Sequence, residues 1–448
     1  MKSRTQAIDT VAQAVDHALR VGATAADAAF VAQASSQVEV RMGALEDVSR
    51  SEGEKLGLRI MVGQRVASVS GSDLSPDGLA DLAQRAIAMA RAAGEDEYAG
   101  LAPKDRLLKG EAPDLQLDPA EDHRPDKLRE MARAAEAAAL GVDGVTNSSG
   151  ASASAQENLF ALATSHGFAD AYSGSGRGCS VAVIAGEGGA MERDYATHSA
   201  RRLDELDAPE SIGELAGKRA VARLGPVKLD GGRMPVLFDP RVATSLLSHL
   251  SSALSGSAVA RRSSFLQSKM GSRIFAPDVT ITDDPLRVGG KRSHPFDGEG
   301  LAVEAMDVIE DGVLKSWFAT SAAARQLGIE PSGHAIRGPG GSPGAGPSNF
   351  WIHAGKRSRQ QLLDSVPRLL IVTELIGQGV NNVTGDYSRG ASGFLVDKGE
   401  IVGPVSGVTI ASNLADMFAT LEPGSDLEFR KGVDSPSLLV PEMTVASS

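Results

Sequence analysis

The run LGLRIMV at residues 56–62 and the run RVASVS at residues 65–70 are both rich in strand-forming residues. Only a Gly-Gln pair separates them, and two such runs around a short glycine turn predict a β-hairpin. Apolar residues at helical spacing precede the hairpin at 5–21. A second helical pattern follows at 75–91, with proline at its first helical position. The order of helix, strands and helix predicts an α+β unit at the N-terminus.

The middle of the chain predicts a second unit. An acidic, proline-containing stretch at 94–122 is typical of a linker. A helical pattern at 125–140, glycine-rich strand patterns over 142–200 and a helical pattern at 210–224 follow it. We therefore expect three domains: an N-terminal α+β domain at 1–112, a central domain at 113–225 and a C-terminal β-rich domain at 226–448.

The last part of the chain alternates short strand patterns with turns. Asp311-Gly312 lies between two apolar pairs and predicts a hairpin, and residues 240–254 predict a helix with one apolar face. Residues 337–348 are rich in glycine and proline, which indicates a surface loop and a candidate cap for an entrance. The predicted fold class is α+β, with N-terminal α/β units followed by a large antiparallel β-rich C-terminal domain.

Composition excludes several classes of function. The chain has 448 residues, with 57 Asp and Glu against 45 Lys and Arg, so its formal net charge is −12. A protein that binds nucleic acid directly, or an anionic membrane surface, needs a basic field, and none stands out here. The single cysteine, Cys179, cannot form an intrachain disulfide, and no targeting segment or long apolar run is present. We expect a cytoplasmic protein with no membrane partner.

Common catalytic motifs are absent from the sequence. No histidine precedes a glutamate, and no two of the eight histidines lie within five residues, which excludes a helical zinc pair. A dispersed metal site at His294, His334 and His353 stays open. No Walker loop occurs, and no G-x-S-x-G match lies between a predicted strand and a predicted helix, as a nucleophile elbow requires. Cys179 is more typical of a small buried residue than of a nucleophile.

Two segments are dense in polar residues between glycines: HPFDGEG at 294–300 and GDYSRGASG at 385–393. Such segments suit a site lined by backbone groups. The alternative is that Asp297 and Asp386 shape turns through their side chains, and that Arg389 pairs with a carboxylate. The residues alone leave both interpretations open.

These segments also carry a resemblance to a known family. Together with RSSFL at 262–266, SGH at 332–334 and PVS at 404–406, they resemble the TldD/PmbA family, on its PmbA (TldE) side, formerly called modulator of DNA gyrase. The resemblance runs through nearly the whole chain. It implies a heterodimeric zinc metalloprotease, built from a TldD-type and a TldE-type chain, that admits small or unfolded peptides to an enclosed chamber.

The resemblance also implies that the metal lies on the other subunit. TldD-type chains carry H-E-x-x-x-H on a helix that matches 240–254, and the matched positions here are Ser248, His249 and Ala253. Serine and alanine cannot replace two imidazoles. We therefore expect no cofactor and no catalytic or metal residue on this chain, and Zn²⁺ on a TldD-type partner.

On this interpretation the chain forms part of the wall of the chamber and holds an extended peptide by strand addition. The candidate peptide-binding residues are Asp297, Glu299, His334, Gly385, Asp386, Tyr387, Ser388, Arg389 and Gly390. Two alternatives stay open. One is a stand-alone, homodimeric peptide-binding or chaperone-like protein. The other is an independent hydrolase that uses a dispersed metal site or a serine.

Overall fold

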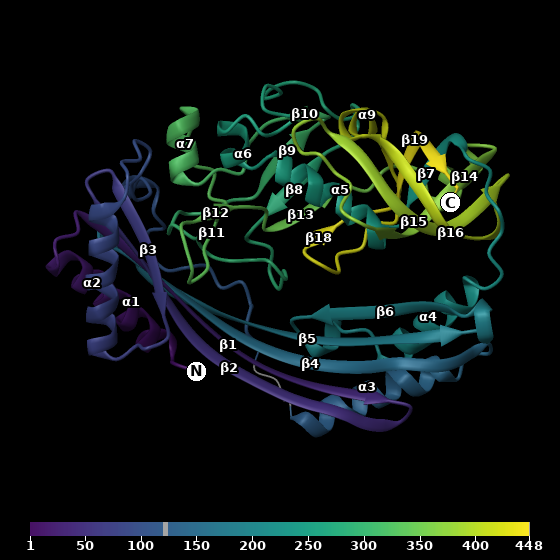
Figure 1. Cartoon of the computed structure of the whole chain (residues 1–448), viewed down its shortest axis with the longest axis horizontal. Coiled ribbons are helices and arrows are strands. Elements are labelled where there is room, and N and C mark those ends of the chain that lie inside the picture. Colours follow the sequence, from purple (N-terminus) through teal and green to yellow (C-terminus); the bar gives the residue numbers. More distant parts are fainter. Residues whose placement is uncertain (120–123, 448) are drawn as a thin grey trace.

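The computed structural model describes residues 1–119 and 124–447. Figure 1 shows a long, curved sheet lying below a second, more compact region rich in strands. The lower sheet has six strands in the order β3-β2-β1-β4-β5-β6, all paired antiparallel. Its strands are β1 (Ala25–Arg41), β2 (Ala44–Val62), β3 (Arg65–Gly71), β4 (Val145–Thr164), β5 (Ala169–Ala185) and β6 (Glu192–Ala200).

Four helices cover one face of this sheet. Helices α1 (Arg4–Arg20) and α2 (Pro76–Ala92) pack near one end, and α3 (Pro125–Leu140) and α4 (Pro209–Ala222) pack near the other. The order helix, three strands, helix therefore occurs twice, and pairing of β1 with β4 joins both copies into one sheet. The helices expected at 5–21, 75–91, 125–140 and 210–224 are confirmed to within two residues at each end. The predicted hairpin is also confirmed, but its first strand, β2, begins twelve residues before residue 56.

Local chemistry explains where the first helices begin. Ser3 caps α1: its side chain accepts from the Gln6 N–H, and the Gln6 side chain accepts in return from the Ser3 N–H. Ser75 caps α2 in the same way through the Gly78 N–H, and Pro76 occupies the first helical position.

The upper region contains a sheet that closes on itself. Strands follow the order β16-β15-β14-β7-β19, and β16 pairs again with β19, which completes the ring. All these pairings are antiparallel except β14 with β7. The strands are β7 (Gly232–Phe238), β14 (Arg368–Ile376), β15 (Asp386–Asp397), β16 (Glu400–Asn413) and β19 (Leu438–Ala446), with β17 (Glu422–Pro423) attached to β19.

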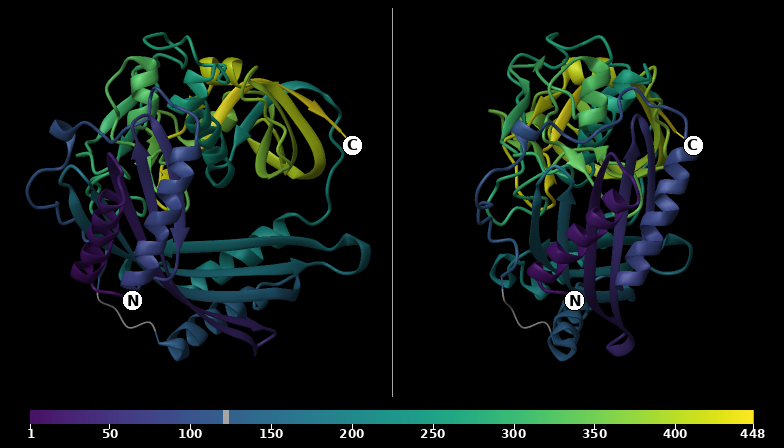
Figure 2. Two further views of the ribbon diagram at one scale, coloured as in Figure 1. Left: turned by 60° about the vertical axis from the view of Figure 1, so that its left-hand side comes forward. Right: turned by 90° about the vertical axis from the view of Figure 1, so that its left-hand side faces the viewer.

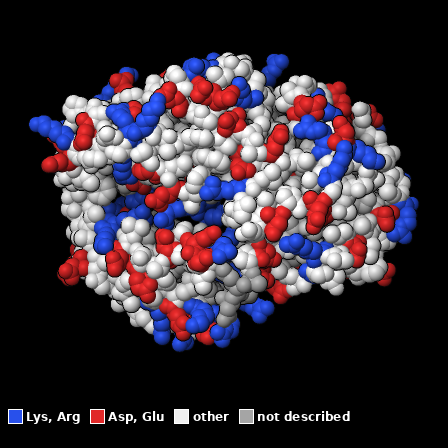
Figure 3. All heavy atoms as spheres, turned by 180° about the vertical axis from the view of Figure 1, so that it is seen from behind, with Lys and Arg blue, Asp and Glu red and all other residues white. Residues whose placement is uncertain are grey.

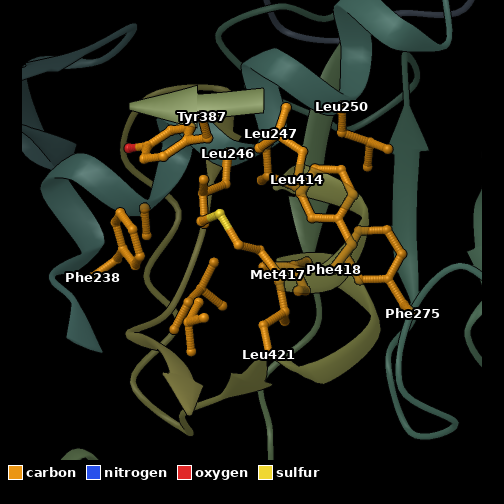
Figure 4. Packing of buried hydrophobic residues seen from close by; sticks show 14 of the residues in the cluster. Phe238, Leu246, Leu247, Leu250, Phe275, Tyr387, Leu414, Met417, Phe418 and Leu421 are labelled. Carbon is orange, nitrogen blue, oxygen red and sulfur yellow. The ribbon is translucent and has the colours of Figure 1, made fainter. Parts of the chain in front are cut away.

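Helix α5 (Pro240–Ala253) and helix α9 (Leu414–Thr420) supply much of the core of the upper region. Figure 4 shows leucines of α5 meeting Met417 and Phe418 of α9, with Phe275 at the rim of the cluster. The apolar face predicted for 240–254 is therefore buried, which leaves the opposite, serine-bearing face of α5 for other contacts.

A smaller sheet completes the upper region. Its order is β10-β9-β8-β13-β18, and the Asp311-Gly312 turn between β9 and β10 has positive φ at both residues, as the predicted hairpin requires. The segment 337–348, predicted as a loop alone, contributes β12 to a two-stranded pairing with β11. The remaining elements are β8 (Ile281–Asp284), β9 (Met306–Glu310), β10 (Val313–Leu314), β11 (Ala335–Ile336), β12 (Gly344–Ala345), β13 (Asn349–Ile352), β18 (Val433–Asp434), α6 (Gly256–Ala260), α7 (Ser321–Leu327), α8 (Arg359–Asp364), and the 3-10 turns η1 (Lys104–Arg106), η2 (Gly188–Ala190) and η3 (Leu203–Glu205).

The predicted fold class is confirmed, and the two regions meet along one side of the molecule. Residues 120–122 of the expected linker lie outside the described residues, and over 94–119 the only helix is η1. Backbone hydrogen bonds fix this part: the Leu117 carbonyl accepts from Ser175 and the Leu115 carbonyl accepts from Gly289. Figure 2 shows the layers in contact on one side and spread apart on the other. Among the described helices, none combines the length and apolar composition that a membrane crossing requires.

Close packing of α3 and α4 generates a stability prediction. A Cβ at Gly213 of α4 would overlap the carbonyl oxygen of Ala135 on α3. Gly213→Ala should therefore cost about 1–3 kcal/mol through overpacking, although alanine alone favours a helix. We expect calorimetry to show a Tm lower by roughly 2–8 °C. Gly94→Ala is the matched control, because nothing lies within 4 Å of its Cβ; a Tm for Gly213→Ala at or above that of the wild type would contradict the packing.

Candidate functional site

A cluster of buried charges joins the lower sheet to the upper region. Asp27 on β1 accepts from Nε of Arg59 on β2 at 2.9 Å, and its other oxygen lies 2.5 Å from Nη2 of Arg337, next to β11. A second carboxylate, Glu299, lies 3.9 Å from the Arg59 guanidinium. Burial raises the pKa of Asp27, but the charges of Arg337 and Arg59 outweigh it and lower the pKa to about 2.

Asp297 and Glu299, both predicted as peptide-binding candidates, lie inside this cluster. The Asp297 carboxylate accepts from the N–H groups of Glu299 and Leu301, each at 2.9 Å, and from Ala335 at 3.1 Å. Glu299 accepts from the Ser321 N–H at 2.7 Å. Burial and the Glu299 charge raise the pKa of Asp297 to about 7, although the three N–H donors oppose this. The contacts tie loop segments together.

His334 lies near by, between Asp283 and Ser332. Its Nε2 is 3.1 Å from Asp283 Oδ2, and its Nδ1 is 3.0 Å from Ser332 Oγ. The order Ser-His-Asp matches that of a hydrolase triad. However, Ser332 Oγ also contacts both backbone groups of Ala319, and His334 is buried against the ring of Phe318. The cleft described below is lined by other residues.

The three histidines considered for a dispersed metal site have separate partners. His353 Nε2 lies 2.7 Å from Thr282 Oγ1, and His294 Nδ1 lies 3.0 Å from the Arg292 carbonyl oxygen. Within residues 1–119 and 124–447, no three His, Cys, Asp or Glu side chains come together as a metal site would require. Cys179 is buried, and burial raises the pKa of its thiol to about 11, which disfavours the reactive thiolate.

The second predicted segment divides between a surface loop and a strand. Gly385 has a φ of +82°, and the exposed Asp386 accepts from Thr384 Oγ1 at 2.6 Å. Ser388 donates its N–H to Gly379 at 2.7 Å. Along β15, alternation places Tyr387 and Arg389 on the same face, whereas Gly390 follows on the other face. Tyr387 enters the core of the upper region, and Arg389 reaches a cleft.

That cleft, of about 640 Å³, lies where the two regions spread apart. Strand β6 and the end of α4 line one side, and α5, β14 and β15 line the other. The lining residues that matter below are Arg193 and Tyr195 from β6, Ser245 and Ser248 from α5, Glu374 from β14, and Arg389 from β15.

Ion pairs fix the two sides of the cleft. Arg241 at the start of α5 contacts Asp194 of β6 at 2.9 Å, and Arg223 after α4 contacts Glu374 of β14 at 2.7 Å. Both partners of the Arg241–Asp194 pair are largely buried, so this pair is shielded from solvent and favoured over exposed pairs, whereas Glu374 of the other pair is 43% exposed.

Helix α5 places the matched motif positions in different surroundings. Ser248 is exposed to the cleft, whereas Ala253 is fully buried in the apolar core. His249 lies between them, with its ring centroid 6.0 Å from that of Tyr387, and burial and the Arg389 charge lower its pKa. A hydroxyl, one imidazole and a methyl group do not fit the donor set of a zinc site.

Sequence reasoning identified Arg389 of the cleft and Glu299 of the buried cluster, but it did not find the other cleft arginines or the Asp27 pairs with Arg59 and Arg337. A signal was available for the latter, because Arg59 interrupts the apolar run 56–62 and Asp27 interrupts an alanine-rich run. A buried charge inside a strand indicates a partner on a neighbouring strand. Only the register, which places Asp27 directly opposite Arg59, identifies that partner.

Models of the PmbA/TldA metallopeptidase family match the chain in three parts. Domain 1 matches residues 26–90, the central domain matches 118–224, and the C-terminal domain matches 231–447. Metalloprotease PmbA from Escherichia coli O157:H7 is 40% identical, over 97% of this chain and 95% of that protein. A Metalloprotease PmbA homolog from Haemophilus influenzae is 35% identical, over 100% of this chain and 98% of that protein.

Solved structures show the same fold. A putative modulator of DNA gyrase from Bacteroides thetaiotaomicron superimposes with a TM-score of 0.90 at 28% identity, covering 98% of both chains. TldE from Thermococcus kodakarensis superimposes with a TM-score of 0.85 at 21% identity, covering 97% of this chain and 100% of the other.

The buried cluster generates a prediction about stability. Asp27→Asn leaves Arg59 and Arg337 buried without their carboxylate, which should cost about 3–5 kcal/mol and lower the Tm measured by calorimetry. The matched control is Lys356→Met, which breaks an exposed pair with Asp278 and should change stability by less than about 1 kcal/mol. Equal effects of the two variants would show that the cluster does not hold the regions together.

Asp297 generates a prediction about pH. Its pKa is about 7 in the folded chain and about 3.9 when unfolded. The folded chain therefore binds more protons between about pH 4 and 7, and the contribution of Asp297 to stability falls as pH rises through that window. We expect the Tm of the wild type, relative to Asp297→Asn, to fall from pH 4.5 to 7 and then level off. The exposed Asp16→Asn variant should show no such trend, and a flat difference for Asp297→Asn would overturn the prediction.

Proposed function

Because the chain belongs to the PmbA/TldD family of metallopeptidases, we propose that it is the non-metal-binding subunit of a heterodimeric zinc peptidase. The other subunit is a TldD-type chain that carries the metal. The substrates are small, unfolded peptides, and this chain forms part of the wall of the chamber that receives them.

The observation that carries the proposal is the set of side chains on helix α5 at the positions that match the metal motif. It faces a cleft between the two regions, as a catalytic helix would, but presents Ser245 and Ser248 to that cleft. Ala253, at the position of the second motif histidine, is buried in the core. The helix keeps its place in the fold while its side chains lack the chemistry to hold zinc. Hydrolysis therefore needs a metal from another chain.

The uncovered face of the lower sheet supports the role of a chamber wall. Helices cover the face that carries the apolar residues of β1 and β4, so the other face is turned toward the upper region. Small polar residues and glycines line shallow cavities on that face: Ser152, Ser154, Gln156, Asn158, Gly176 and Gly178. Such a surface leaves backbone groups accessible and imposes little sequence preference, as unfolded peptides require.

Strand addition to β6 is the mode of peptide binding that this geometry favours. Strand β6 ends the strand order of the lower sheet and lines the cleft. An extended peptide that continues the sheet there would lie between β6 and α5, with main-chain hydrogen bonds supplying affinity. Of the candidate residues, Arg389 and Gly390 lie on the facing strand β15. Asp297 and His334 instead contact segments within the upper region, and Glu299 lies near Arg59 of the lower sheet.

A second candidate function is a stand-alone peptide-binding protein without hydrolytic activity. The cleft and the polar face are both complete within one chain, which favours this alternative over an independent hydrolase. It predicts peptide binding that needs no partner and no effect of a TldD-type chain.

Metal content and activity test the proposal together. The chain purified alone without chelator should contain almost no zinc by elemental mass spectrometry and should not cleave an unfolded peptide. Addition of a TldD-type chain should give a stable complex that cleaves the peptide, and a chelator should abolish cleavage.

His294→Ala and His353→Ala should leave the activity of the complex unchanged. About one zinc per chain, or cleavage by this chain alone, would move the catalytic centre onto it. Failure to form a complex would favour the stand-alone binding protein.

A further inference from the structure

Two arginines in the cleft have no carboxylate partner. Arg389 on β15 and Arg193 on β6 come from opposite sides of the same cleft, and neither forms an ion pair within the described part of the chain. In contrast, Arg223 and Arg241 are paired with acidic residues. Unpaired arginines on both walls of one cleft indicate a site for an anion.

The charge of the cleft is opposite to that of the whole chain. Four arginines line it against three carboxylates, although the chain carries a net charge of −12. All three carboxylates are already engaged by Arg223 or Arg241: Glu192, Asp194 and Glu374. Figure 3 shows Lys and Arg side chains gathered in the hollow between the two halves of the molecule. The positive excess is therefore local and falls on the two unpaired arginines.

Polar atoms beneath the cleft also lack partners. Nε of Arg389 and Oγ of Ser245, both in residues that line the cleft, are buried and make no hydrogen bond within the described chain. Beside them, Nε2 of His249 and the hydroxyl of Tyr387 are unpartnered as well. Tyr387 is 1% exposed, and Figure 4 shows its hydroxyl pointing out of the apolar cluster. Buried polar groups are rarely left unpaired, so these groups are available to hydrogen-bond a molecule bound in the cleft.

We propose that this cleft binds the carboxylate of an extended peptide, with Arg389 as its main partner and Arg193 as the second. The occupant is a peptide only if the function proposed above holds. A guanidinium presents a planar pair of N–H donors that matches a carboxylate, and Ser245 and Ser248 add hydroxyl donors from α5.

A singly charged ligand suits the cleft better than a phosphate dianion does. Four arginines and three carboxylates line it, so their formal charges leave an excess of one positive charge, which one carboxylate neutralises. Two sources of carboxylate fit the chemistry equally: the C-terminus of a peptide, and an Asp or Glu side chain within it. Either would anchor an extended peptide between β6 and α5.

Three fluorescently labelled forms of one octapeptide test the proposal on the full chain without a partner. The probe is an uncharged octapeptide of Ala, Gly and Ser, prepared with a free C-terminal carboxylate and as its C-terminal amide. A third form is the amide with one central Glu. Fluorescence anisotropy should show the free carboxylate binding about tenfold more tightly than the plain amide. Tight binding of the Glu-containing amide would assign the site to any carboxylate, and weak binding would restrict it to the C-terminus.

Variants identify the residues that confer the preference. Arg389→Gln should remove the carboxylate preference, Arg389→Lys should keep part of it, and Arg193→Gln should reduce it by a smaller factor because Arg193 is exposed. Arg85→Gln, an exposed change on α2 with the same loss of charge, is the matched control. Unchanged far-UV circular dichroism and Tm would show that each variant folds.

Several results would overturn the proposal: equal binding of carboxylate and plain amide, no binding of any form, or a preference that survives both Arg389→Gln and Arg193→Gln. These results differ from failure of the proposed function. A chain that activates a TldD-type partner but shows no preference fails only here, whereas a preference without any effect on a partner contradicts only the heterodimer.

Discussion

The position of the upper region on the lower sheet depends on one buried carboxylate. Asp27 neutralises two arginines, one from the neighbouring strand and one from the distant segment beside β11. Neither guanidinium is accessible to water, so each is stable only while the carboxylate is in place. This requirement brings the two regions together at one end of the long strands. The same strands continue well beyond the contact, and their far ends diverge from the upper region. The cleft lies in this diverging part, where the ion pairs of Arg241 with Asp194 and of Arg223 with Glu374 still link its two sides.

Most elements with a strong local pattern were predictable. Helix α5 has apolar residues at the helical period because one of its faces is buried. The hairpin strand 56–62 is a nearly continuous apolar run because both of its faces are buried. The length of β1 and β2 was not predictable, since the first half of β2 is exposed throughout and its polar sequence is indistinguishable from that of a loop. Closure of the upper sheet depends on pairing of β16 with β19 across about thirty residues, and no local pattern encodes such a contact.

The candidate site was predictable only in part, because contacts between residues far apart in the sequence also decide the role of each charged group. Segments 294–300 and 385–393 were identified because charged residues lie between glycines. Burial shows that the charged residues of the two segments have different roles. The carboxylates of the first segment accept backbone N–H groups inside the protein, whereas Arg389 of the second reaches a cleft. Residue type cannot distinguish these cases, because a buried charge and a binding charge are equally polar in sequence. The distinction comes from what surrounds each group, and that is a property of long-range contacts.

Helix α5 packs into the core with one face and presents the other face to the cleft. Its buried leucines fix the helix against α9, and this packing does not depend on the residues of the opposite face. The serines of that face are therefore not required by the core. Beside it, the unpaired Arg389 and the buried Tyr387 hydroxyl retain electrostatic and hydrogen-bonding capacity that packing does not use. A wall that only enclosed a chamber would lose stability through such groups and gain nothing from them. Their presence on the serine-bearing side of α5 is better explained by contact with a ligand than by packing.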